Sequence, residues 1–302
     1  MQGLMELAVH LREPLPLETF EGVWEHLTAL YGEAKLESEL RGIPLPEQPR
    51  RMYVGDEFCL HRLPDPEELG GFVRQANELS WAVTLLTPPV TDEGLEKCAP
   101  LFDRLDGPHL GAEVVVNDWG ALQYVREKHP CLPVSLGRLL NKGFKDPRLP
   151  DAGTMERVSE EAADLLNRCT FDFARFQEEM VRLKVSRLER DLLPYGTPRL
   201  EIPEGLGVSV YFPFGYVTMG RVCWLATFEH TGTRKFSLAK GCPRTCRDMS
   251  LRLKDAQRNL LLYQEGNAIF SLYPPSLLAS FIRWATDRAV RFVYQGLAIG
   301  VR

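Results

Sequence analysis

Two apolar periodicities alternate along this chain, and their alternation restricts the possible fold more than any other feature. Segments 66–79 and 91–105 carry apolar residues at helical spacing, and each begins with helix-capping residues. Short runs with strand character lie between the helical segments, at 5–11, 51–58, 81–87, 112–116, 132–136, 185–193, 206–212, 260–263, 268–272 and 291–294. Strands that alternate with helices form right-handed βαβ units, so the sequence predicts a mainly parallel sheet.

Chain length then favours a closed barrel over an open sheet. The chain has 302 residues, which is within the range of a single (β/α) barrel. We therefore expect an α/β fold, a TIM-barrel-like (β/α) barrel of regular or irregular form, with residues 1–302 as one domain. Its longest helix is predicted over 155–183.

The charge balance and the apolar runs argue against two classes of protein. The net charge is −5, whereas a nucleic-acid-binding surface needs concentrated positive charge, so we expect no nucleic-acid partner. No apolar run approaches the roughly 18 residues that span a membrane, and the first ten residues lack the pattern of a secretory leader. We expect a cytoplasmic protein without a membrane span, in a reducing compartment where its seven cysteines form no disulfide framework.

One pair of cysteines has the spacing of a metal site. Cys242 and Cys246 enclose three residues in a Gly- and Pro-containing segment, which suits a tight loop whose thiolates reach one metal centre. Cys223 precedes Cys242 by eighteen intervening residues, and Cys59 directly follows a predicted strand, at the barrel end where sites assemble. The spacing leaves open an iron–sulfur cluster, a Cys₄ zinc site and buried core thiols. The remaining cysteines are expected to be ordinary core thiols: Cys98, Cys131 and Cys169.

Three blocks of this sequence resemble one known family. They are 53–59 (Tyr-Val-Gly-Asp-Glu-Phe-Cys), 113–122 (Glu-Val-Val-Val-Asn-Asp-Trp-Gly-Ala-Leu) and 136–142 (Leu-Gly-Arg-Leu-Leu-Asn-Lys). Together with the order of the four cysteines, these blocks resemble the collagenase-like peptidase family of unassigned catalytic type. The chain looks most similar to the branch that contains the iron–sulfur proteins of oxygen-independent ubiquinone hydroxylation. The resemblance covers about residues 50–300.

This resemblance implies a cofactor and a class of reaction. The implied cofactor is a 4Fe-4S cluster on four thiolates, those of Cys59, Cys223, Cys242 and Cys246. The cluster would lie at the C-terminal face of the barrel strands, with 224–247 as a cluster-binding loop inserted near the barrel mouth. The implied reaction is oxygen-independent hydroxylation of a small aromatic or quinone-like substrate, with a paralogous partner subunit or an electron donor. The long segment before the second strand and the loop between the late cysteines depart from that branch, so the substrate does not carry over.

Two other functional classes stay open. The name of the family suggests proteolysis, but the chain has no H-E-x-x-H or G-x-S-x-G motif, and its six histidines do not pair at ligand spacing. The third class is a non-catalytic electron-transfer or scaffold subunit.

Polar residues after the predicted strands, with one aromatic residue, are candidates for the wall of a substrate cavity. The expected substrate-binding residues are Asn117, Asp118, Arg138, Asn141, Lys142 and Tyr211. Arg138 and Lys142 suit an anionic carboxylate, with a structural ion pair as the alternative, and Asp118 is equally suited to cap a helix. Arg62 lies close behind the first cysteine of the proposed site, where it is a candidate for tuning a cluster or an ordinary loop residue.

Overall fold

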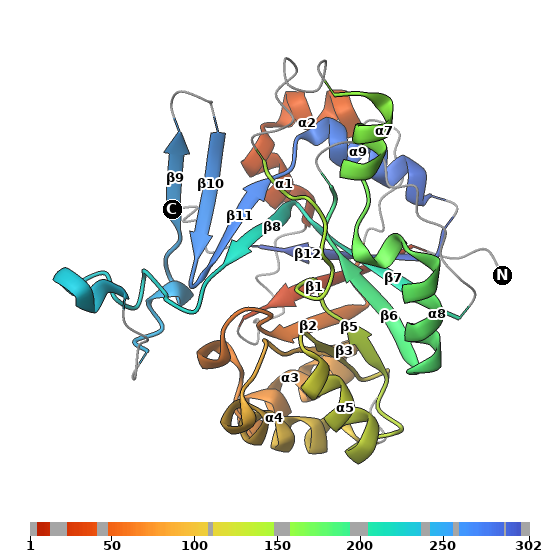
Figure 1. The fold of residues 1–302 in the computed structure, drawn as a ribbon, viewed down its shortest axis with the longest axis vertical. Coiled ribbons are helices and arrows are strands. Elements are labelled where there is room, and N and C mark those ends of the chain that lie inside the picture. The colour runs from red at the N-terminus through yellow and green to blue at the C-terminus, as the bar shows by residue number, and fades with distance from the viewer. Residues whose placement is uncertain are drawn as a thin grey trace.

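A closed barrel of eight parallel strands forms the centre of the molecule (Figure 1). The computed structural model describes residues 5–12, 23–40, 48–107, 111–147, 158–193, 205–236, 242–255, 260–286 and 288–296. The barrel strands are β1 (Glu6–Leu11), β2 (Arg51–Gly55), β3 (Ala82–Leu86), β4 (Glu113–Val116), β5 (Val134–Leu136), β6 (Val185–Arg190), β7 (Gly207–Phe212) and β12 (Val290–Gln295). Their order around the barrel is β1-β12-β7-β6-β5-β4-β3-β2, which confirms the predicted TIM-barrel-like α/β fold.

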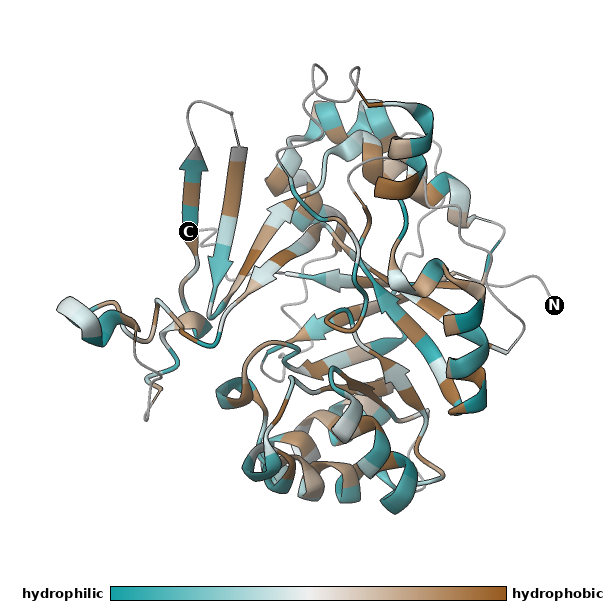
Figure 2. Cartoon of the chain, viewed as in Figure 1, coloured by the Kyte–Doolittle hydropathy of each residue, from teal (hydrophilic) through white to brown (hydrophobic). Residues whose placement is uncertain are grey.

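Helices connect the strands and cover the barrel. They are α1 (Val23–Tyr31), α2 (Glu33–Leu40), α3 (Pro66–Leu79), α4 (Asp92–Leu105), α5 (Trp119–Lys128), α7 (Glu160–Leu166), α8 (Ala174–Arg182) and α9 (Pro275–Ala285). The caps read from the sequence are present: Asp65 forms a capping box at α3, and Thr91 and Asp118 cap α4 and α5. Figure 2 shows apolar residues concentrated on the central strands and polar residues on the outer faces of these helices. No helix in the described ranges is both long enough and apolar enough to traverse a bilayer.

The long helix predicted over 155–183 is wrong. Residues 151–157 lie outside the described ranges, and the remainder divides into α7, a 3-10 turn at Thr170–Asp172 and α8. The turn pairs with the loop after β5, since Thr170 N donates to Lys142 O at 2.9 Å and Gly143 forms a β-bridge with Cys169. These tertiary contacts take backbone groups that a continuous helix would use, and they override the local periodicity.

The second correction concerns the late strands. The segments 260–263 and 268–272 do not join the barrel but belong to a separate antiparallel sheet of four strands. These strands are β8 (Phe214–Met219), β9 (Leu251–Asp255), β10 (Leu260–Glu265) and β11 (Ala268–Leu272), in the order β8-β11-β10-β9. Only Gly266 and Asn267 separate β10 from β11, which is too short for a parallel crossover and enforces a hairpin.

This second sheet packs beside the barrel through a small apolar cluster. Phe58 from the loop after β2 packs edge-to-face on Phe270, with the ring centroids 5.5 Å apart. Phe214 and Tyr263 pack in the same cluster, together with Leu139 from the loop after β5. The inserted unit is therefore larger than the loop 224–247 expected from the sequence, of which 237–241 lie outside the described residues.

Candidate functional site

The turn between β10 and β11 ties two of the cysteine-bearing segments together. Asn267 Nδ2 donates to Phe58 O at 2.7 Å and to Gly220 O at 2.9 Å. Gly220 N in turn donates to Asn267 O at 3.0 Å. Phe58 precedes Cys59, and Gly220 lies three residues before Cys223, so one side chain holds both segments against the same turn.

The same turn also contacts a third cysteine. Gly266 has φ +58°, and a Cβ added to it would lie 3.8 Å from Cys246 Sγ and 3.7 Å from Arg62 Nη1. The thiol, the guanidinium and the turn thus pack around one point. Cys59, Cys223 and Cys246, which are far apart in sequence, converge on the β10–β11 turn.

The loop after β2 fixes the position of Cys59. Asp56 Oδ1 accepts hydrogen bonds from Phe58 N and Cys59 N, each at 2.7 Å. A 3-10 turn at Leu60–Arg62 follows directly. Cys59 therefore lies just beyond the carboxyl end of β2, the face of the barrel that the sequence predicted for it.

Electrostatic effects among the thiols indicate that all four candidate cysteines are neighbours. Burial raises the pKa of Cys59 to about 12, and Asp56 and Cys246 raise this pKa further. Burial also raises the pKa of Cys223 and of Cys246. The neighbouring thiol of Cys242 raises the pKa of Cys223 further, and the thiol of Cys223 raises the pKa of Cys246 further. Buried thiols resist ionisation, and coordination to a metal would favour their thiolate form.

One buried arginine faces three of these thiols. Arg62 forms ion pairs with Asp56 at 3.1 Å and with Glu265 at 2.8 Å. Burial raises the pKa of Cys59, Cys223 and Cys246, and the positive charge of Arg62 lowers all three. The sequence singled out Arg62 only by its place close behind Cys59, and the structure adds its contacts to the β10–β11 turn.

The other cysteines lie apart from this group. Cys98 is buried in α4, where burial and then Asp118 raise its pKa to about 12. Cys169 is buried directly before the 3-10 turn that precedes α8. Cys131 is exposed, so the expectation of a core thiol is wrong there.

The donor set fits an iron–sulfur cluster in type and number. Four thiols come from three segments of chain, as the Cys₄ ligation of such clusters requires. In the described ranges, no three His, Cys, Asp or Glu side chains lie close enough together to hold a single metal ion.

Arg138, expected to bind substrate, lies in a buried ion network. It is fully buried, and its guanidinium donates to Glu57 Oε2 at 2.9 Å and to Asp191 Oδ1 at 2.8 Å. It also donates to Gln295 Oε1 at 3.1 Å and lies 3.6 Å above the centre of the Tyr211 ring. The structural alternative from the sequence, an ion pair, therefore describes the contacts of Arg138. Tyr211 is likewise fully buried beneath it.

Asn117 and Asp118 hold loops in place. Asn117 Oδ1 accepts from Leu139 N at 3.0 Å, and its Nδ2 donates to Thr87 O at 2.9 Å. Asp118 caps α5 by accepting from Ala121 N at 2.7 Å, and it also accepts from Val90 N at 3.0 Å. Both side chains position the carboxyl-terminal loops of the barrel.

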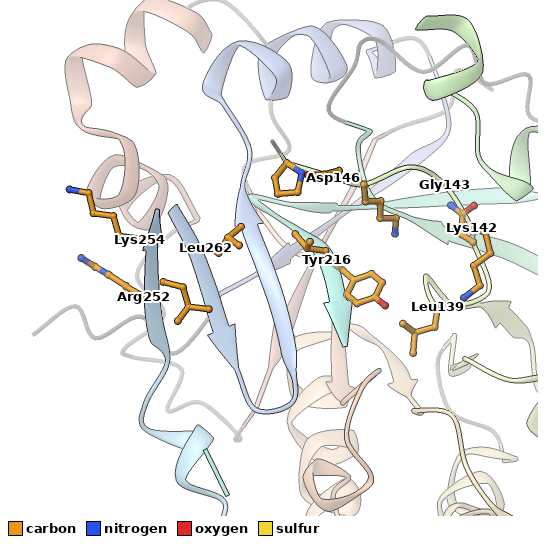
Figure 3. A pocket seen from close by; sticks show the side chains of 13 residues that line it. Leu139, Lys142, Gly143, Asp146, Tyr216, Arg252, Lys254 and Leu262 are labelled. Atoms are coloured by element: carbon orange, nitrogen blue, oxygen red, sulfur yellow. The ribbon is translucent and has the colours of Figure 1, made fainter. Parts of the chain in front are cut away.

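A cavity of about 920 Å³ lies between the loop after β5 and the antiparallel sheet (Figure 3). Asn141 and Lys142, both predicted from the sequence, line it together with Lys145, Leu139 and Tyr216. Figure 3 shows the Tyr216 ring pointing toward Leu139, while Arg252 and Lys254 on β9 extend away from that ring.

Tyr216 connects this cavity to the cysteines. Its ring stacks on Phe58 with the centroids 5.0 Å apart, and Phe58 is the neighbour of Cys59 in sequence. Lys145 Nζ lies 4.8 Å from the centre of the Tyr216 ring and 2.6 Å from Asp191 Oδ2. Sequence reasoning missed Lys145 and Tyr216, because neither follows a strand end that the periodicity predicts.

Comparison with known proteins does not assign the chain to a family. No family model matches the sequence, and a search of curated proteins finds no significant relative. The likeness to the collagenase-like peptidases thus depends on the sequence blocks and on the order of the cysteines.

Proposed function

We propose that this protein binds a 4Fe-4S cluster through Cys59, Cys223, Cys242 and Cys246. The observation that supports the proposal best is the β10–β11 turn, where Asn267 bonds the segments before Cys59 and Cys223 and a Cβ added to Gly266 would lie 3.8 Å from Cys246 Sγ. A hairpin turn beside three cysteine-bearing segments can hold their thiols close enough to bind one cluster. Arg62 adds a buried positive charge beside thiolates that carry negative charge.

The cluster would supply one-electron redox chemistry. Four thiolates close the coordination of the irons, so substrate would react beside the cluster and not on it. The cavity lined by Asn141, Lys142 and Tyr216 supports an enzyme or enzyme subunit that acts on a small aromatic or quinone-like substrate. Oxygen-independent hydroxylation is the reaction that the family resemblance suggests. A reducing cytoplasmic setting, with a paralogous subunit or an electron donor as partner, completes the proposal.

Two alternatives have less support. Proteolysis would need a nucleophile with its base or a metal-bound water, and the sequence has neither an H-E-x-x-H nor a G-x-S-x-G motif to supply one. A non-catalytic electron-transfer or scaffold subunit would keep the cysteines but would have no use for the cavity beside Tyr216.

The direct test is the iron and sulfide content of protein purified without oxygen. Brown protein with broad absorption near ~400 nm is expected, and the Cys→Ala variants at positions 59, 223, 242 and 246 should each lose iron. Cys131→Ala is the matched control, because its thiol is exposed and outside the group. A colourless, zinc-loaded protein would replace the proposal with a structural zinc site. Iron content that survives in Cys59→Ala would remove that ligand.

A second test concerns the cavity. Lys142→Ala should weaken binding of an anionic aromatic probe, by about 1.5–3 kcal/mol if a charge-assisted bond is lost, and leave iron content unchanged. Lys128→Ala, at the end of α5 and away from the cavity, is the control. Equal binding by both variants would exclude Lys142 from the substrate site.

A further inference from the structure

The segment that carries three of the cysteines differs in charge from the rest of the chain. Residues 221–254, which we call the basic arm, hold eight Lys or Arg residues against two Asp or Glu residues. The net charge of the whole chain is −5, so the remaining residues carry eleven more negative than positive charges. The structure describes 221–236 and 242–254 of the arm, which carry seven of its eight basic residues and both acidic ones, and the binding surface is taken from these residues alone.

The arm exposes the aromatic side chains of Trp224, Phe228 and Phe236. They are 52%, 70% and 71% exposed, and the last two are the most exposed aromatic residues in the described ranges. The backbone between them is nevertheless ordered by Thr227, which is 2% exposed and donates through Oγ1 to Lys235 O at 2.9 Å. Figure 1 shows this part of the chain, in cyan, extending away from the barrel on the left of the view. Exposed aromatic residues held on an ordered segment are typical of a binding surface.

The basic and aromatic side chains lie beside the candidate cluster ligands. Trp224 directly follows Cys223, and Arg247 directly follows Cys246. Arg244 lies between Cys242 and Cys246, so basic and aromatic residues of the arm adjoin all three of its cysteines in sequence.

We propose that the basic arm is the docking surface for a small, acidic electron-carrier protein whose cofactor is exposed within an acidic rim. This inference depends on the proposed function and names the partner of that site. A basic surface attracts an acidic carrier and accelerates encounter, while the exposed aromatics supply apolar contact at the centre. The transfer moves one electron from the carrier, which is oxidised, to the cluster, which is reduced, and no bond forms or breaks.

The size and charge of the arm favour such a carrier over a nucleic acid. Interleaved basic and aromatic residues also suit single-stranded nucleic acid. An extended polyanion, however, would reach beyond the arm and be repelled by the rest of the chain, which carries eleven more negative than positive charges. Electron-transfer pairs use small interfaces, under about 1,200 Å² in total, which a short arm can provide.

The experiment measures binding of the anaerobically purified protein to reduced and oxidised flavodoxin, an acidic flavin carrier, by calorimetry. Lys235→Glu combined with Lys254→Glu should weaken binding on the order of tenfold at low salt, and added salt should weaken wild-type binding similarly. Lys97→Glu, an exposed charge reversal on α4, is the matched control and should leave binding unchanged. Phe228→Ser should weaken binding, while Leu165→Ser, at 69% exposure on α7, should not.

The outcomes separate this inference from the proposed function. Unchanged flavodoxin binding in the arm variants, with cluster present, overturns the docking surface and leaves the cluster in place. Binding of a short single-stranded RNA in preference to flavodoxin, lost in the same variants, assigns the arm to nucleic acid and overturns the inference. A wild-type protein without iron defeats the proposed function. In that case, weaker flavodoxin binding by the arm variants than by the wild-type protein would still support the docking surface, and equal binding would overturn it.

Discussion

The two ends of the barrel each bury a network of ion pairs, but the networks differ. At the amino ends of the strands, Arg51 and Arg291 each bond Glu6, at 2.9 Å and 2.7 Å, and Arg291 also bonds Glu113. Burial raises the pKa of Glu113, but Arg291 and Arg51 outweigh burial and hold this pKa at about 2. The carboxylate is therefore ionised and fully engaged.

At the carboxyl ends the network is less complete. Arg138 and Lys145 bond Glu57 and Asp191 there, yet Glu57 Oε1 and the Tyr211 hydroxyl have no partner within the described structure. Burial dominates at Glu57 and raises its pKa despite Arg138. The network at the amino end thus stabilises the barrel. The carboxyl end, where barrel enzymes form their active sites, instead contains buried polar groups without hydrogen-bond partners.

The largest effect is expected from breaking the amino-end network. Arg291→Met leaves Arg51 as the remaining ion-pair partner of Glu6 and Glu113 and should cost about 3–5 kcal/mol in the free energy of unfolding. Urea denaturation at neutral pH measures this loss. Arg182→Ala, which removes an exposed pair with Glu179 on α8, should leave the midpoint unchanged.

The matching change at the other end should cost less. Arg138→Met leaves Lys145 on Asp191, and Glu57 can take up a proton because its pKa is already raised. A loss of about 1.5–3 kcal/mol is expected in the same denaturation series. Equal losses for Arg291→Met and Arg138→Met would contradict the difference between the two networks.

A carboxylate between the two networks predicts a pH dependence. Burial raises the pKa of Glu189 to about 7, against the lowering effect of Arg291. Since the folded pKa exceeds the ordinary value of 4.5, the stability that this group contributes is complete below about pH 4.5 and is lost as the pH rises through about 7. The loss amounts to about 3 kcal/mol.

Glu189→Gln should reduce this dependence. Denaturation midpoints at several pH values from about 4 to about 8 should fall for the wild-type protein as pH rises toward 7, and should fall less for the variant, in which Glu57 still has a raised pKa. A wild-type profile that is flat across this window would show that Glu189 is not held at a raised pKa.

At the carboxyl end, the turn beneath the cysteines offers a matched pair of substitutions. Gly266→Ala and Gly232→Ala both place Cβ at positive φ, +58° and +60°, and each should cost about 1–2 kcal/mol. The Cβ at Gly266 would lie 3.8 Å from Cys246 Sγ, an ordinary van der Waals contact, and no atom lies within 4 Å of the Cβ at Gly232. The backbone strain at Gly266, however, falls on the turn in which Asn267 bonds the segments before Cys59 and Cys223. Iron content should fall in Gly266→Ala alone. Equal iron content in both variants would show that the β10–β11 turn does not support cluster binding.

The smallest expected effect is a shift in reduction potential. Arg62→Gln removes a positive charge beside the thiols and should move the midpoint potential to more negative values, because reduction adds an electron. Arg62→Lys keeps the charge and should keep most of the wild-type potential. An anaerobic redox titration compares the two variants, and identical shifts would mean that the ion pairs of Arg62, not its charge, matter.

The sequence predicted the barrel well because its elements are locally specified. Asp65, Thr91 and Asp118 start helices through capping bonds that need no tertiary context. The antiparallel sheet was mistaken for barrel strands, since periodicity identifies a strand but not its partner. The two-residue turn at Gly266 and Asn267 was the available signal that β10 and β11 form a hairpin.

The candidate site was only partly predictable. Cysteine spacing identified the group that the structure brings together, and Asn141 and Lys142 do line the cavity. Arg138 was read as a substrate ligand because sequence shows no carboxylate partners such as Glu57, which pairs with it across 81 positions. Such long-range pairing depends on the closed barrel and cannot be read from neighbours in the chain.

Native mass spectrometry of the anaerobically purified protein tests the central claim most directly. Wild-type chains should carry the mass of one cluster of four irons and four sulfides, and Cys223→Ser chains should not. Cys131→Ser chains, altered at the exposed thiol, should retain that mass. A wild-type mass equal to the bare chain, or to the chain with one zinc ion, would contradict the account.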